Sequence, residues 1–145
     1  MLLALFAAAT LHHGAEPIAF PQQSQVVYAI VGERLLTGVS DPSVVDDRGV
    51  VTLKSADGSA FACKVGYGYQ RGGLGSFVCS DGSQFRVPYQ GYSPWSGTGG
   101  GTDSGRRVSL CYGFQPKEAA RRLSAPPGYA LEVEGGRLVL ARAST

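Results

Sequence analysis

The sequence predicts a mainly β fold, an antiparallel meander of hairpins that forms a curled or partly closed sheet, with one short helix near the C-terminus. Two observations predict this class. An Asp-Gly-Ser-x-Phe block occurs twice, at 57–61 and 81–85. Asp-Gly between alternating apolar residues is a strong hairpin signal, because glycine tolerates the positive φ of a tight turn. The chain also contains 21 Gly and 8 Pro, which implies many turns between short elements.

Length and composition indicate one small folded domain, expected over residues 25–142. A chain of 145 residues can bury a single core, and its 43% hydrophobic and 17% charged residues argue against wholesale disorder. The formal net charge is only +2, and the arginines are scattered along the chain. A nucleic-acid partner is therefore not expected, since such proteins carry a concentrated basic surface.

Residues 1–15 form an apolar N-terminal segment that resembles a secretory signal peptide. Ala7 and Ala9 are placed for cleavage, but no basic residue precedes the apolar run. We interpret the segment as an incomplete signal, which predicts a periplasmic or secreted protein. The alternative is a short apolar helix that packs on the domain. The run is shorter than the roughly 20 apolar residues of a membrane-spanning helix, so no transmembrane span is expected.

The elements before the C-terminal part are expected to be strands and loops. Gly32 separates the first two strands, Asp41-Pro42 begins a turn, and each repeat supplies a hairpin that turns at Asp-Gly. The segment 91–105 contains Gly, Ser and Thr and little apolar surface, which is typical of a flexible loop. The expected strands are 25–31, 33–38, 49–53, 60–65, 76–79, 84–89 and 107–114.

The C-terminal part predicts a helix and a last hairpin. Pro116 suits the first position of a helix over 115–124, whose last turn carries Arg121 and Arg122. Strands at 129–134 and 137–141 are expected to turn at Gly135-Gly136. We expect the helix to cover an edge or an open end of the sheet.

The spacing of the cysteines favours one disulfide. Cys63 and Cys79 are symmetric about residue 71, so two antiparallel strands that turn there would place the two sulfurs opposite each other. The alternative is two buried free thiols. We favour the disulfide because the spacing agrees with an exported protein. Cys111 is left over and is expected in the core, with an intermolecular or reactive thiol as the alternative.

The second repeat, Gly75-x-Phe77-x-x-x-Asp81-Gly82-Ser83-x-Phe85, is similar to the MORN repeat, a short hairpin unit. The likeness covers residues 49–90 at most. The Cys79-Ser80-Asp81-Gly82 turn also resembles that of a group of small uncharacterised bacterial envelope proteins. These resemblances imply a ladder of hairpins, a non-catalytic role, and docking to a membrane or a protein.

Candidate catalytic sets are few, so we do not expect an enzyme. His12 and His13 lie in or beside the apparent signal and, if that is removed, leave no histidine base for a Ser-His-Asp or Cys-His arrangement. Three cysteines without Cys-x-x-Cys spacing do not predict a zinc site. We expect no metal and no cofactor. The carboxylates of a small hydrolase would come from Asp46, Asp47, Asp57 and Asp81, but turn and loop positions already account for these residues.

Aromatic side chains give the best functional signal. Tyr and Trp offer a large contact area with a polar handle at low entropic cost, which is typical of recognition surfaces. The alternative is that Tyr89, Tyr92 and Trp95 close an open side of the sheet as part of the core. The candidate binding residues, in two Gly-rich loops, are Tyr67, Tyr69, Arg71, Tyr89, Tyr92 and Trp95.

The sequence thus predicts a non-catalytic secreted or periplasmic β domain that binds an envelope component, a glycan or a protein through these loops. Two alternatives remain open. The first is a small hydrolase that works through carboxylates. The second is a structural subunit of an envelope assembly, which a continuous apolar patch on one face of the sheet would favour.

Overall fold

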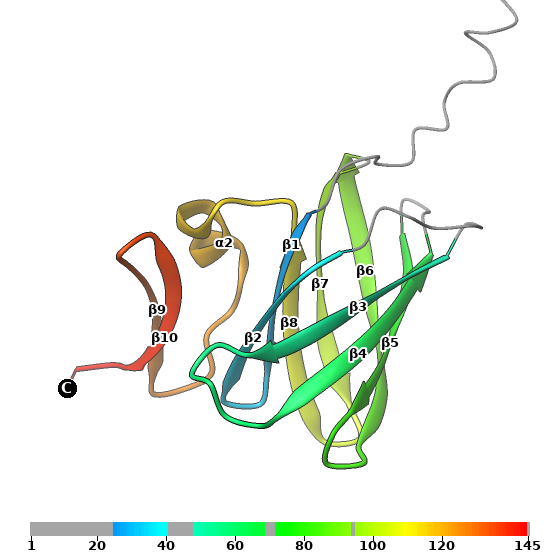
Figure 1. Ribbon diagram of the computed structural model, residues 1–145, viewed down its shortest axis with the longest axis horizontal. Helices are drawn as coiled ribbons and strands as arrows, with labels where there is room; N and C mark the ends of the chain where they lie inside the picture. Colours follow the sequence, from blue (N-terminus) through cyan, green and yellow to red (C-terminus); the bar gives the residue numbers. More distant parts are fainter. Residues whose placement is uncertain (1–24, 41–47, 69–71, 94, 145) are drawn as a thin grey trace, which may run out of the picture.

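The computed structural model describes residues 25–40, 48–68, 72–93 and 95–144, and its main part is a closed antiparallel barrel of eight strands (Figure 1). Each strand pairs with the next along the chain, and the last pairs with the first. The predicted meander is confirmed, and its closure is complete. The strands are β1 (Val26–Val31), β2 (Arg34–Val39), β3 (Arg48–Ser55), β4 (Ala62–Gly68), β5 (Gly72–Cys79), β6 (Gln84–Ser93), β7 (Ser96–Asp103) and β8 (Arg106–Tyr112).

The two sequence repeats form the hairpins β3–β4 and β5–β6, as predicted. Their turns have the same construction. The carboxylates of Asp57 and Asp81 each accept the backbone N–H of the serine two residues later, at 2.9 Å. Gly58 and Gly82 follow with φ of +83° and +88°, a conformation that glycine adopts without steric cost. Both turns lie at the lower end of the barrel in Figure 1.

The prediction of a loop over 91–105 is wrong for residues 91–93, which belong to β6, and for residues 96–103, which form β7 between β6 and β8. Gly97, Gly99 and Gly101 pair with Tyr112, Leu110 and Val108. Because Val108 and Leu110 belong to the barrel core, these three glycines face the interior. They contribute little apolar area, but Gly97 and Gly99 let neighbouring backbone and tyrosine side chains approach closely. Backbone pairing with two strands therefore orders a segment that composition alone marks as flexible.

The barrel interior is a packed apolar core that includes the disulfide. Cys63 and Cys79 are opposite each other in the β4–β5 register and are bonded, which bears out the predicted pairing. Phe77 and Phe85 stack beside them with ring centroids 4.8 Å apart. The remaining buried members are Ala29, Val31, Leu36, Val51, Leu53, Val65, Val87, Val108 and Leu110.

A second apolar cluster joins the outer wall of the barrel to a C-terminal layer, drawn on the left of Figure 1. This layer consists of α2 (Pro116–Arg122), β9 (Tyr129–Glu134) and β10 (Arg137–Arg142). Tyr28 and Ile30 point outward from β1 and are buried in this cluster with Leu123 and Leu138, which lie on the C-terminal layer. Both faces of β1 are therefore buried.

The C-terminal layer corrects two expectations. The helix covers the outer wall, because Ala119 packs in one cluster with the outward-facing Tyr28 and Ile30, and a closed barrel has no free edge to cover. The hairpin β9–β10 pairs only within itself and forms a separate two-stranded sheet. The helix and the last hairpin themselves lie where the sequence predicts them.

Several expectations fall outside the described residues. These are the apparent signal peptide at 1–15 with His12 and His13, the turn at Asp41-Pro42, and the pair Asp46-Asp47. Among the residues that are described, no helix has the length and apolar character needed to cross a membrane.

Candidate functional site

The structure separates the predicted binding residues into two groups. Tyr67 on β4 and Tyr89 on β6 are half-buried and pack against the barrel core, where Tyr89 meets Tyr112 edge-on with ring centroids 6.5 Å apart. Tyr92 and Trp95 lie outside, with 50% and 42% of their surface exposed. Tyr67, Tyr89 and Tyr92 are on strands and not in loops. Tyr69 and Arg71 lie outside the described residues.

Tyr92 belongs to a surface group that brings together three separate parts of the chain. Its ring lies 6.4 Å from the ring of Phe114, which follows β8. The guanidinium of Arg122, at the end of α2, lies over both rings at 5.1 Å from each centroid. We call Tyr92, Trp95, Phe114 and Arg122 the aromatic–arginine cluster.

Trp95 is fixed to this group through its backbone. Its carbonyl oxygen lies so close to Gly113 that a Cβ there would come within 1.8 Å of it. Gly113 also has φ of +80°, so this position needs glycine for both space and conformation. In the same turn the Ser93 hydroxyl accepts the Trp95 backbone N–H at 3.1 Å and lies 2.8 Å from the Ser96 hydroxyl. The turn between β6 and β7 is therefore held against the residue that precedes Phe114.

Polar contacts fix the orientation of the other members. The Tyr92 hydroxyl lies 2.7 Å from the hydroxyl of Thr98 on β7, so one end of the ring is tethered. Arg122 donates from Nε to Glu118 Oε2 at 2.9 Å, and Arg121 lies 3.6 Å from the other oxygen of the same carboxylate. Phe114 packs against the second apolar cluster. The cluster is thus a pre-arranged surface of aromatic rings and one planar cation.

Comparison of the chain with protein-family models, curated proteins and solved structures finds no match. The assignment of a site therefore rests on geometry. Sequence reasoning found Tyr92 and Trp95 but missed Phe114 and Arg122. From the sequence, Phe114 is expected only as the end of a strand, and Arg122 only as part of the last turn of a helix. Their contact with Tyr92 depends on β7 lying between β6 and β8, and the sequence predicts a loop in place of β7.

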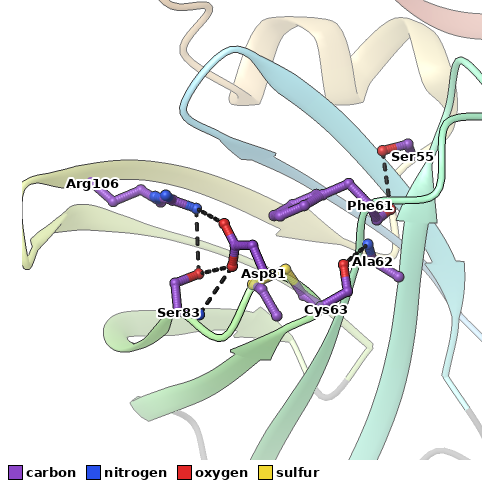
Figure 2. Close-up of a disulfide and its surroundings, with 9 residues drawn as sticks. Ser55, Phe61, Ala62, Cys63, Asp81, Ser83 and Arg106 are labelled. Carbon is purple, nitrogen blue, oxygen red and sulfur yellow. Dashed lines mark hydrogen bonds and ion pairs between the residues drawn. A yellow bond between two sulfur atoms is a disulfide. The ribbon is translucent and has the colours of Figure 1, made fainter.

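The other polar site is the turn of the second repeat, beside the disulfide (Figure 2). Asp81 accepts the Ser83 hydroxyl at 2.5 Å and lies 3.2 Å from the guanidinium of Arg106. Hydrogen bonds from Ser83, assisted by Arg106, lower the pKa of Asp81 to about 2. Hydrogen bonds from Ser59 likewise lower the pKa of Asp57. Both groups are carboxylates at neutral pH, whereas a general acid needs a raised pKa.

The lowered pKa of Asp81 predicts a loss of stability in acid. The ordinary value is 3.8, so the carboxylate stabilises the folded state above about pH 4, and this contribution is lost as the pH falls towards 2. We expect the urea midpoint of Asp81→Asn to fall less between pH 4 and pH 2 than that of the wild type. Urea unfolding at several pH values measures this. Parallel pH profiles for the two proteins would contradict the prediction.

Cys111 is a buried thiol in the second apolar cluster, which agrees with its expected core position. Burial raises its pKa to about 12, and the thiolate is the reactive form. We expect no reaction of the folded protein with Ellman's reagent at pH 8, and one thiol per chain after unfolding without reductant. Rapid labelling of the folded protein would mean that Cys111 is accessible. Three thiols after unfolding would mean that the disulfide is absent.

Within the part of the chain that the structure describes, no three His, Cys, Asp or Glu side chains gather as a metal site. Asp57 and Asp81 each accept a hydrogen bond from the serine of their own turn, and each turn lies beside a different arginine. The aromatic–arginine cluster therefore remains the arrangement best suited to an interaction, because it presents flat apolar faces and a charged donor together.

Proposed function

We propose that this protein is a non-catalytic binding domain of the periplasm or the extracellular space, and that it binds an envelope glycan through the aromatic–arginine cluster. The observation that carries the proposal is the exposure of Tyr92, which lies beside Phe114 and Arg122, and of Trp95 in the adjoining turn. Large aromatic side chains are costly to leave in water, and such surfaces typically mark interaction sites.

The compartment is supported by the disulfide. Cys63 and Cys79 are 1% and 5% exposed and bonded inside the barrel. Structural disulfides of this kind form and persist in oxidising compartments and are rare in the cytosol. An exported protein of this sort meets envelope material directly, which is why an envelope component is the proposed ligand.

The non-catalytic character is supported by the described carboxylates. The hydrolase alternative needs two cooperating carboxyl groups, one of them protonated near neutral pH. Asp57 and Asp81 have lowered pKa values, and each is engaged in its own turn. Binding through exposed rings requires no such group.

A glycan suits the cluster because the Tyr92 ring is held in place with half of its surface exposed. The tether of the Tyr92 hydroxyl to Thr98 and the packing of Phe114 restrict ring motion, so little side-chain entropy is lost when a flat ligand stacks. Sugar rings offer apolar C–H faces for such stacking and hydroxyls for the surrounding polar groups. Arg122 adds a hydrogen-bond donor at the same place.

Co-sedimentation with purified bacterial cell-wall sacculi tests the proposal. We expect the wild-type protein to sediment with the sacculi, and Trp95→Ala and Tyr92→Ala to remain largely in the supernatant, because each loses one exposed stacking surface. Val133→Ala on β9 is the matched control, since Val133 is as exposed as Trp95 at 42% but lies outside the cluster. This variant should sediment like the wild type.

Thermal unfolding of all four proteins shows whether the substitutions act on binding alone. We expect similar melting temperatures, because both aromatic side chains are on the surface. Equal sedimentation of wild type and cluster variants would show that the cluster is not the binding surface. Absence of sedimentation for every protein would rule out the cell-wall glycan as the ligand.

A further inference from the structure

We infer that the ligand of the aromatic–arginine cluster is an acidic saccharide, and that a carboxylate of this ligand binds to the guanidinium of Arg122. This inference rests on the proposed function and names the chemistry of its ligand. It comes from the way in which Arg122 is held and from the charges around it.

Arg122 is oriented by contacts that leave part of its guanidinium available. Nε is used by Glu118, and the plane of the group lies over Tyr92 and Phe114. Among the described residues, the two terminal nitrogens make no hydrogen bond. A guanidinium presents its N–H groups in a fixed planar fork, which matches the two oxygens of a carboxylate. Little entropy is lost on binding because the side chain is already placed.

The surrounding charge favours an anion. Helix α2 carries Lys117, Arg121 and Arg122 against the single carboxylate of Glu118, and that carboxylate is shared by the two arginines. Arg121 and Arg122 also lie in the last turn of the helix, where the partial negative charge of the helix end offsets them only in part. A neutral glycan would bring no negative charge to pair with this excess positive charge.

The neighbouring rings select a saccharide over a small free anion. The half-exposed Tyr92 ring lies against the guanidinium, and Trp95 is exposed in the adjoining turn, so a lone carboxylate would leave both side chains exposed. In a uronic-acid unit the carboxylate carbon is bonded directly to the sugar ring. One such residue can therefore pair with Arg122 while its ring, or that of the next unit, stacks on an aromatic face.

The protein contains a reporter for this site, because Trp95 is its only tryptophan. We would titrate the full chain with a short oligogalacturonate and follow the tryptophan fluorescence. The same oligomer with its carboxyl groups methyl-esterified is the matched control ligand, since it keeps the rings and removes the charge. We expect the acid to bind about tenfold more tightly than the ester, as for a charge-assisted hydrogen bond.

A pair of variants assigns the effect to one arginine. Arg122→Gln should weaken binding of the acid about tenfold and binding of the ester less, because the ester offers this guanidinium only neutral acceptors. Arg122→Lys keeps the charge without the planar fork, so its affinity for the acid should lie between those of the wild type and Arg122→Gln. Arg121→Gln is the matched control. It changes the net charge equally on the same helix and contacts the same glutamate, but it lies over neither ring.

The outcomes separate this inference from the proposed function. Equal affinity for acid and ester, unchanged in Arg122→Gln but lost in Tyr92→Ala, would overturn the acidic ligand and leave binding at the cluster standing. Equal losses of affinity for the acid in Arg121→Gln and Arg122→Gln would also overturn it. The positive charge of the helix as a whole would then attract the acid, without a specific pair at Arg122. A fluorescence that responds to neither oligomer overturns the inference, while co-sedimentation judges the proposed function separately.

Discussion

Replacing Cys63 and Cys79 together by alanine is expected to lower the free energy of unfolding by about 3 kcal/mol. The two residues are 16 positions apart, and a cross-link of that span restricts the unfolded chain by about this amount in the chain-entropy model. The melting temperature should fall by about 10 °C for a domain of this size. Denaturant unfolding of the wild type and the double variant gives the difference directly.

Cys111→Ala is the control for this prediction. It also removes a sulfur from a buried position, but it leaves the cross-link intact. We expect a smaller loss, about 1 kcal/mol, from packing alone. Equal losses in the two proteins would mean that the disulfide contributes only through packing, contrary to the chain-entropy argument.

Gly99→Ala is expected to destabilise the barrel by about 2 kcal/mol or more, as overpacking of a tight site does. A Cβ at this position would lie 2.6 Å from the carbonyl oxygen of Pro88 and 2.8 Å from the Cβ of Tyr89, both on β6. Relief would require β6 and β7 to separate, which opens the barrel wall. Urea unfolding monitored by far-UV circular dichroism measures the loss.

Gly101→Ala supplies a matched control on the same strand and the same face. A Cβ there would meet the Pro88 side chain at 3.6 Å, an ordinary contact distance. We expect a change within about 0.5 kcal/mol, because the restricted unfolded chain offsets any small loss. If Gly99→Ala lowered the free energy of unfolding no more than Gly101→Ala does, β6 and β7 could not approach each other as closely as described.

Local patterns were sufficient to predict most of the fold. The Asp-Gly turns fixed the hairpins β3–β4 and β5–β6, and the positions of Cys63 and Cys79 about residue 71 predicted their pairing. Pro116 and the arginines of the last turn located the helix. These features depend on residues close in sequence, where turn chemistry and periodicity act directly.

Barrel closure could not be predicted in the same way. The sequence of β7 lacks apolar alternation, since its inward positions are glycines that make room for Tyr89 and Tyr112. Its order comes from two neighbouring strands, a tertiary effect that outweighs local composition. The aromatic–arginine cluster was only half recognised for the same reason, because Phe114 and Arg122 reach Tyr92 only when β7 is in place.

Amide hydrogen exchange of residues 96–103 in the native protein tests the central claim most directly, because both the closed barrel and the aromatic–arginine cluster depend on β7. We expect these amides to be protected to about the same degree as those of β6 and β8, since β7 pairs with both strands. Exchange at the rate of an unstructured chain, with β5 and β6 still protected, would contradict the account. The barrel would then be open, and Tyr92 and Trp95 would have no fixed place beside Arg122.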